Sequence, residues 1–142
     1  MSTLRNYLLI ATTVGLMAVG GCATTGGGLS SSASRLESRA EALRTEARNG
    51  DARAGFQSDA RELAEEARDF RRTVEDRDSS KKDVREAFNE LSKRYHAMRD
   101  EVERSQSREA DRGFRPVTEA YLDVEREMRA RDSRRDRYAS DY

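Results

Sequence analysis

Hydrophobic residues recur in four stretches of the chain at alternating intervals of four and three residues. Each stretch contains six such positions, and polar or charged residues fill most of the positions between them. An α-helix completes a turn about every 3.6 residues, so this spacing places the six side chains on one face of a helix. The sequence therefore predicts four amphipathic helices. Their hydrophobic faces, which we call seams, consist in chain order of Leu29, Ala33, Leu36, Ala40, Leu43 and Ala47; Phe56, Ala60, Leu63, Ala67, Phe70 and Val74; Val84, Phe88, Leu91, Tyr95, Met98 and Val102; and Ala110, Phe114, Val117, Tyr121, Val124 and Met128.

The stretches between the seams contain residues that are typical of helix ends. Ser80 and Asp83 have the spacing of a capping box, in which a serine and an acidic residue satisfy each other's backbone N–H groups. Ser107 is the predicted N-cap of the fourth helix. Pro116 lies inside the fourth seam, so this helix should either kink near its first turns or begin late, around Gly113.

Four helices of matched length predict an all-α fold, an up-down-up-down four-helix bundle. Each seam spans roughly 28 Å at a rise of about 1.5 Å per residue. An extended coiled coil is the alternative, because the heptad phase continues from the second seam to the third through Arg77 and Lys81. The phase is lost between the first and second seams and between the third and fourth. That loss favours the bundle.

Composition changes this picture little. Charged residues make up 38% of the chain and hydrophobic residues 35%, proportions that by themselves approach those of a disordered chain. The seams argue against disorder, because they concentrate the apolar side chains on single helix faces. Basic and acidic residues are balanced at 27 each. The overall charge therefore does not indicate a nucleic-acid partner.

The first 22 residues have the anatomy of a secretory signal. Arg5 provides a short basic region, residues 7–19 form an apolar run, and Gly20 and Gly21 lead into Cys22, the only cysteine. The apolar run has 13 residues, fewer than the roughly 20 that a standard membrane span needs. The segment is therefore predicted to be a cleaved signal peptide.

Val19-Gly20-Gly21-Cys22 resembles the lipobox of bacterial prolipoproteins, in which a branched apolar residue and two small residues precede an obligatory cysteine. The resemblance implies cleavage before Cys22, a thioether-linked diacylglycerol on its sulfur, and acylation of the freed amine. Several acyl chains together anchor a protein firmly, since each buried methylene contributes about 0.8 kcal/mol. Ala23 stands where, in the enterobacterial family rule, Asp favours retention at the inner membrane. The resemblance therefore implies the outer membrane, with the mature domain on the periplasmic face.

These patterns divide the chain into four predicted parts. Residues 1–21 are the signal peptide, and residues 22–33 are the lipidated cysteine with a flexible tether rich in Gly and Ser. Residues 34–131 are the helical bundle, and residues 132–142 are a charged C-terminal tail. Arginine forms forked pairs with phosphate, so the arginine-rich stretch 129–138 is a candidate contact for anionic lipid headgroups, although its acidic residues weaken that case.

The residues offer little for catalysis. His96 is the only histidine. Any Ser-His-Asp triad within the chain would have to use it, and metal sites that need several histidines are excluded. His96, together with Met98 and Met128, leaves one alternative, haem ligation of the kind in which a His and a Met on different helices bind the iron. Methionine as core filler is the favoured interpretation. We therefore predict no catalytic residue, no metal site and no cofactor, and do not expect an enzyme.

The predicted function is that of a lipid-anchored periplasmic helical bundle with a structural or protein-interaction role at the outer membrane. Its partners would be the membrane, through lipidated Cys22, and a protein of the cell envelope, with no nucleic acid. Two alternatives stay open. One is a carrier of haem or another hydrophobic small molecule in the bundle core, and the other is a coiled-coil spacer in the cell envelope.

Overall fold

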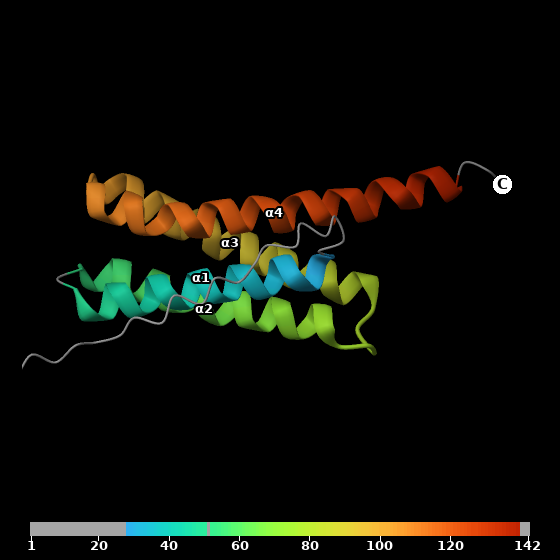
Figure 1. Ribbon diagram of the computed structural model, residues 1–142, viewed down its shortest axis with the longest axis horizontal. Coiled ribbons are helices and arrows are strands. Elements are labelled where there is room, and N and C mark those ends of the chain that lie inside the picture. Colours follow the sequence, from blue (N-terminus) through green and yellow to red (C-terminus); the bar gives the residue numbers. More distant parts are fainter. Residues whose placement is uncertain (1–27, 51, 140–142) are drawn as a thin grey trace, which may run out of the picture.

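The computed structural model describes residues 28–50 and 52–139, with side chains placed up to residue 133. This part of the chain is all-α and contains four helices (Figure 1). They are α1 (Leu29–Asn49), α2 (Ala54–Glu75), α3 (Lys81–Ser105) and α4 (Arg108–Ala139). None of these helices combines the length and hydrophobicity that crossing a membrane requires.

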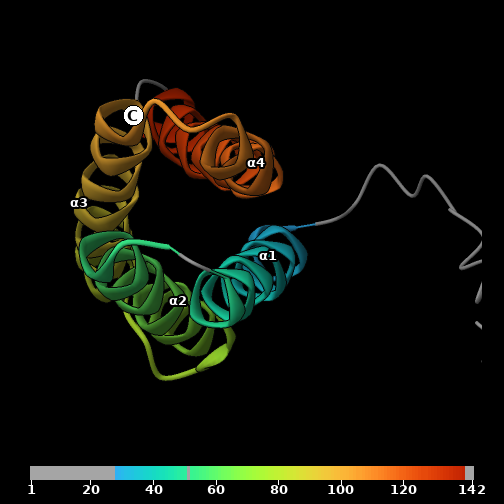
Figure 2. The ribbon, with the colours of Figure 1, turned by 90° about the vertical axis from the view of Figure 1, so that its left-hand side faces the viewer.

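The four helices form a ring in which each packs against the next in the chain and α4 packs against α1 (Figure 2). Neighbouring helices run antiparallel (Figure 1), and a polar contact joins each pair: Glu41 with Arg68, Glu62 with Arg94, Ser92 with Tyr121, and Arg35 with Asp123. This arrangement confirms the predicted four-helix bundle. The extended coiled coil is wrong for this part of the chain, because all four seams face one another within a single molecule.

The seams form the core. Every seam residue is buried except Val74, Phe88 and Ala110, which are partly buried and pack against the others. Ala64 and Ala120, which lie beside the seams, are buried as well. The core is thus complete within residues 29–128, and the described residues leave no buried side-chain polar atom without a hydrogen-bond partner. We therefore expect a soluble fragment, residues 23–142, to fold without residues 1–22.

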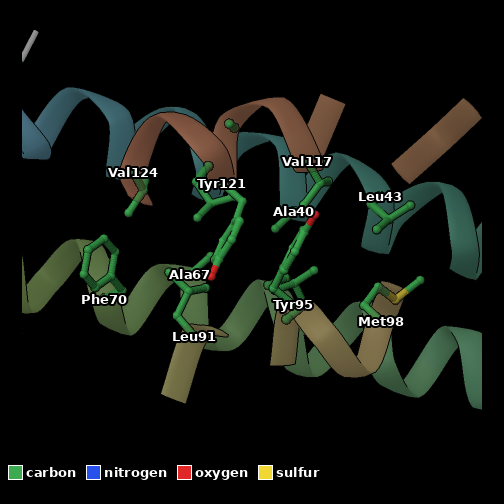
Figure 3. Close-up of a cluster of buried hydrophobic side chains, with 14 of the residues drawn as sticks. Ala40, Leu43, Ala67, Phe70, Leu91, Tyr95, Met98, Val117, Tyr121 and Val124 are labelled. Carbon is green, nitrogen blue, oxygen red and sulfur yellow. The ribbon is translucent and has the colours of Figure 1, made fainter. Parts of the chain in front are cut away.

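The two halves of the core differ in side-chain size. The seam of α1 alternates Leu with Ala, and the seam of α2 carries Ala60 and Ala67 at its centre. Helices α3 and α4 instead meet through aromatic rings, with Tyr95 and Tyr121 stacked face to face at a centroid distance of 3.8 Å (Figure 3). Small residues let α1 and α2 approach closely, while rings hold α3 and α4 apart.

Charged side chains join α1 and α2 beside the core. Arg68 pairs with both Glu37 and Glu41, and Arg71 pairs with Glu37 and with Glu75. Glu37 and Arg71 are only 20% and 26% exposed, so solvent screens this network less than it screens a fully exposed ion pair. Three of these pairs, Arg68 with Glu37 and Glu41 and Arg71 with Glu37, cross between the helices and support the observed register of α1 against α2.

Two helices run past the predicted boundaries of the bundle. Helix α1 begins at Leu29, inside the predicted tether 22–33, and α4 continues to Ala139, inside the predicted tail 132–142. Leu29 and Ala33 are 2% and 0% exposed, so the first turn of α1 is held by the core despite its run of serines. Six residues therefore separate Cys22 from the first residue of α1, and α4 continues beyond Met128, the last residue of its seam.

A capping box determines where α3 begins. The predicted capping box is confirmed: the backbone N–H of Asp83 donates to the Ser80 hydroxyl at 3.2 Å, and that of Ser80 donates to the Asp83 carboxylate at 2.7 Å. These hydrogen bonds with Ser80 hold the pKa of the Asp83 carboxyl below its usual value. A capped start at Ser80 separates α3 from α2, so the heptad phase through Arg77 and Lys81 does not produce a fused helix.

Helix α4 begins at Arg108, so the predicted late start at Gly113 was wrong. Ser107 accepts a hydrogen bond at its hydroxyl from the backbone N–H of Ala110, as predicted for an N-cap. This cap and the acidic residues of the first turn stabilise the turns that precede Pro116. Pro116 lies within the helix.

Candidate functional site

A groove of about 410 Å³ lies at the end of the bundle where the α1–α2 and α3–α4 connections meet. Figure 2 looks onto this end of the molecule, and in Figure 1 it is the left-hand end. All four helices contribute to its lining, which consists of Leu43, Glu46, Ala47, Gly50, Ala52, Arg53, Phe56, Glu101, Ser105, Ser107, Glu109, Ala110 and Gly113. The volume falls within the range of about 300–1,000 Å³ that is usual for small-molecule sites.

Small residues position the groove walls. A Cβ atom on Gly113 would lie 3.2 Å from Oε2 of Glu46, so glycine lets the start of α4 lie against the Glu46 side chain near the end of α1. Gly55 has a similar place at the start of α2, where an added Cβ would lie 3.5 Å from Oε1 of Glu101. Two glycines from different helices thus lie directly against carboxylates of their neighbours, on opposite sides of the groove.

The groove is acidic. Its lining carries three carboxylates, from Glu46, Glu101 and Glu109, against the single guanidinium of Arg53. The Glu101 side chain is only 12% exposed and pairs with Arg104 at 3.0 Å. Asp59, one turn after Gly55 on α2, has its pKa raised, first by burial and then by the negative charges of Glu101 and Glu62. An elevated carboxyl pKa is the expected consequence of burial combined with crowded negative charge.

A basic groove lies beside the acidic one, along the outer side of α1 and α2. Its volume is about 400 Å³, and its lining includes Arg44, Arg48 and Arg61 together with Gln57 and Ser58. The Gln57 amide donates to the backbone oxygen of Ala52, which lines the acidic groove, so the two grooves adjoin at the α1–α2 connection. This end of the bundle therefore presents negative and positive surfaces side by side.

The chemistry of the acidic groove suits recognition. Leu43, Ala47 and Phe56, all buried in the core, provide an apolar floor, and the carboxylates lie around it. An apolar floor with an acidic rim matches a side chain that is apolar along its length and positive at its tip, such as arginine or lysine. None of the described residues forms a cluster of His, Cys, Asp and Glu side chains that could hold a metal ion.

Sequence reasoning did not identify this groove. Glu46 and Gly113 are separated by 66 intervening residues and meet only because α1 and α4 lie side by side. Gly113 was noted only as a candidate helix start. A glycine within a stretch that the seams predict to be helical was the available signal, because glycine in a helix often marks a close approach.

The candidate haem ligands are not brought together. His96 is exposed on α3, whereas Met98 is fully buried in the core. Met128 lies on α4, and the hydrogen bond between Ser92 and Tyr121 sets the register that places it level with the start of α3. In that register His96 and Met128 are separated by about three helical turns, or roughly 16 Å along the bundle. The two residues therefore do not form an axial pair for one haem.

The predicted lipobox residues Val19, Gly20, Gly21 and Cys22 lie outside the described residues. No known protein-family model matches the chain, and no curated protein or solved structure gives a match either.

Proposed function

We propose that the chain is a lipid-anchored bundle protein of the bacterial outer membrane, held there through Cys22 and facing the periplasm, where it binds a protein of the cell envelope. The lipobox-like sequence at residues 19–22 supports the anchor. The position of the groove supports the interaction role and is the observation that carries it: the groove lies at the opposite end of the bundle from the start of α1, to which the anchor is joined.

The length of the tether and the length of α1 determine how far the groove lies from the anchor. Seven Cα–Cα steps separate Cys22 from Leu29, so the start of α1 lies within about 24 Å of the lipidated sulfur. Helix α1 has 21 residues and is about 32 Å long. An anchored bundle that stands away from the membrane would therefore hold the groove end roughly 30 Å or more from the surface, within reach of a periplasmic partner.

The anchor is tested by replacing its cysteine. We expect Cys22→Ser to abolish incorporation of labelled palmitate, because a hydroxyl cannot replace the thiol in the thioether. The protein should also move from the outer-membrane fraction to the soluble or inner-membrane fraction. Thr24→Ala, two residues further on, is the matched control and should label normally. Undiminished palmitate labelling of the Cys22→Ser variant would refute the lipid anchor.

The interaction role is tested by photo-crosslinking in intact cells. A photoreactive phenylalanine at Arg53, which is exposed at the groove, should give a specific adduct with an envelope protein. The same residue at Arg72, whose side chain is 67% exposed at the far end of α2, is the control and should give none. Equal adducts at both positions, or none at Arg53, would contradict a partner at the groove.

A small-ligand carrier is the second candidate, favoured by the volume of the groove. The site for such a ligand would be the groove at the end of the bundle rather than the packed core. The same experiment separates the two functions, since an adduct at Arg53 with the mass of a small molecule would favour the carrier.

A further inference from the structure

Helix α4 extends beyond the end of the bundle at which α1 begins (Figure 1). Arg35 of α1 pairs with Asp123 of α4 at 2.8 Å, and Arg35 is six residues after Leu29. In this antiparallel register Leu29 lies level with residue 129. Residues 130–139, the α4 extension, therefore continue past the start of α1 for about 15 Å.

The α4 extension also reaches past the start of α3. The hydrogen bond between Ser92 and Tyr121 places Lys81, the first residue of α3, level with residue 132 of α4. The last seven residues of α4 thus project past α3 as well, by about 10 Å. Met128 is the last core residue of α4, so the extension is not needed to complete the core.

The α4 extension is basic. It contains four arginines and two aspartates. One of these acids, Asp132, pairs with Arg85 of α3 at 2.6 Å. The extension and Arg85 together therefore carry a net charge of +3, although the chain as a whole is neutral. Ala130, Tyr138 and Ala139 are its only apolar residues, so it has no hydrophobic face for insertion into a bilayer.

We infer that the α4 extension binds the anionic headgroups of the membrane to which the bundle is anchored, an inference whose biological setting rests on the proposed lipid anchor. The extension projects from the end of the bundle that the anchor holds within about 24 Å of the lipid. Its reach of about 15 Å brings the arginines to distances at which charges still interact, since the screening length at physiological salt is about 8 Å. Guanidinium groups pair with phosphate in forked hydrogen bonds.

This contact would give the bundle a defined orientation. An acyl anchor and a short tether allow the domain to tilt freely, whereas a second attachment through α4 fixes the extension against the surface. The groove, at the other end of the bundle, then faces away from the membrane. Anchor and basic segment together act as the two signals that stable membrane attachment commonly combines.

The test uses the soluble fragment 23–142, which lacks Cys22, so its result is independent of lipidation. Each net positive charge near an anionic surface changes the partition constant roughly fivefold. We therefore expect the fragment to cosediment at least about tenfold better with vesicles containing 30% phosphatidylglycerol than with vesicles of phosphatidylcholine alone. R134Q/R135Q/R137Q should remove this preference, because it cancels the net charge of the extension and Arg85.

The matched control is R48Q/R108Q/R112Q, which removes three exposed arginines from the groove end and changes the net charge equally. It should keep the preference for anionic vesicles. Equal losses in both triple variants would show that binding follows overall charge and would overturn the inference, as would the absence of any preference in the unsubstituted fragment. Circular dichroism of each variant verifies that the bundle is folded.

Discussion

Leu63→Ala in the soluble fragment is expected to lower the free energy of unfolding by about 2–5 kcal/mol. Leu63 is 0% exposed at the centre of the α2 seam. Truncation removes buried methyl groups and leaves a cavity, and an α-helix packed on two sides cannot collapse far to fill it. A helical domain of this size has a total stability on the order of 10 kcal/mol, so the loss would be a large fraction of it.

Leu122→Ala is the matched control, since Leu122 is the same residue type on a helix but is 47% exposed. Its effect should stay within about 0.5 kcal/mol. Urea denaturation followed by circular dichroism measures both variants. Similar stabilities for the Leu63 and Leu122 variants would mean that the seams do not form the core in solution.

The contrast between Leu63 and Leu122 also shows why the fold could be predicted from sequence. Leu122 directly follows the seam residue Tyr121, and a step of one residue turns a side chain about 100° around the helix. Seam membership therefore separated buried from exposed leucine without any tertiary information. Of the three exceptions, Val74 and Ala110 lie at the ends of their seams, where fewer neighbours cover them, whereas Phe88 lies within the third seam.

Helix boundaries were predicted less well, because at a helix end the conformational preferences of the residues compete with the contacts that they make in the core. The serines that follow Leu29 are typical of a tether, yet the buried contacts of Leu29 and Ala33 outweigh their weak helix preference. At Pro116 the proline suggested a break, whereas the capped turn that begins at Ser107 and the buried residues on either side keep the helix continuous.

The groove could not be predicted, because it depends on how the helices pair and in what register. Glu46 comes against Gly113, and Glu101 against Gly55, only once the order of the helices around the ring is set. In the sequence, Glu46 and Glu101 are two of 27 acidic residues, and no local pattern distinguishes them from the others. The resemblance of residues 19–22 to a lipobox, in contrast, rests on a local pattern of four residues and needs no fold to be proposed.

Tyr121→Ala should destabilise the bundle by about 3–5 kcal/mol, the range for large aromatic residues truncated in a core. Tyr121 is 4% exposed, lies parallel to Tyr95 within 4°, and stacks on Phe88 at 6.1 Å. These rings fill the space between α3 and α4, so their loss should loosen that pair more than α1 and α2. Amide hydrogen exchange should show lower protection in α3 and α4, and uniform loss across all four helices would contradict this division.

Tyr121→Phe keeps the ring and removes only the hydroxyl, which shares a hydrogen bond of 2.9 Å with Ser92. Its expected cost at neutral pH is about 0.5–1.5 kcal/mol. Burial raises the pKa of the Tyr121 hydroxyl above its ordinary value near 10. The unfolded chain then loses this proton first, so the stability that the neutral hydroxyl contributes is complete below about pH 10 and falls as pH rises through the folded pKa. The free energy of unfolding of Tyr121→Phe should therefore decline less between about pH 9 and pH 11 than that of the unsubstituted fragment. Parallel declines in the two proteins would mean that the Tyr121 hydroxyl ionises as readily in the bundle as in the unfolded chain, and that α3 and α4 leave it open to water.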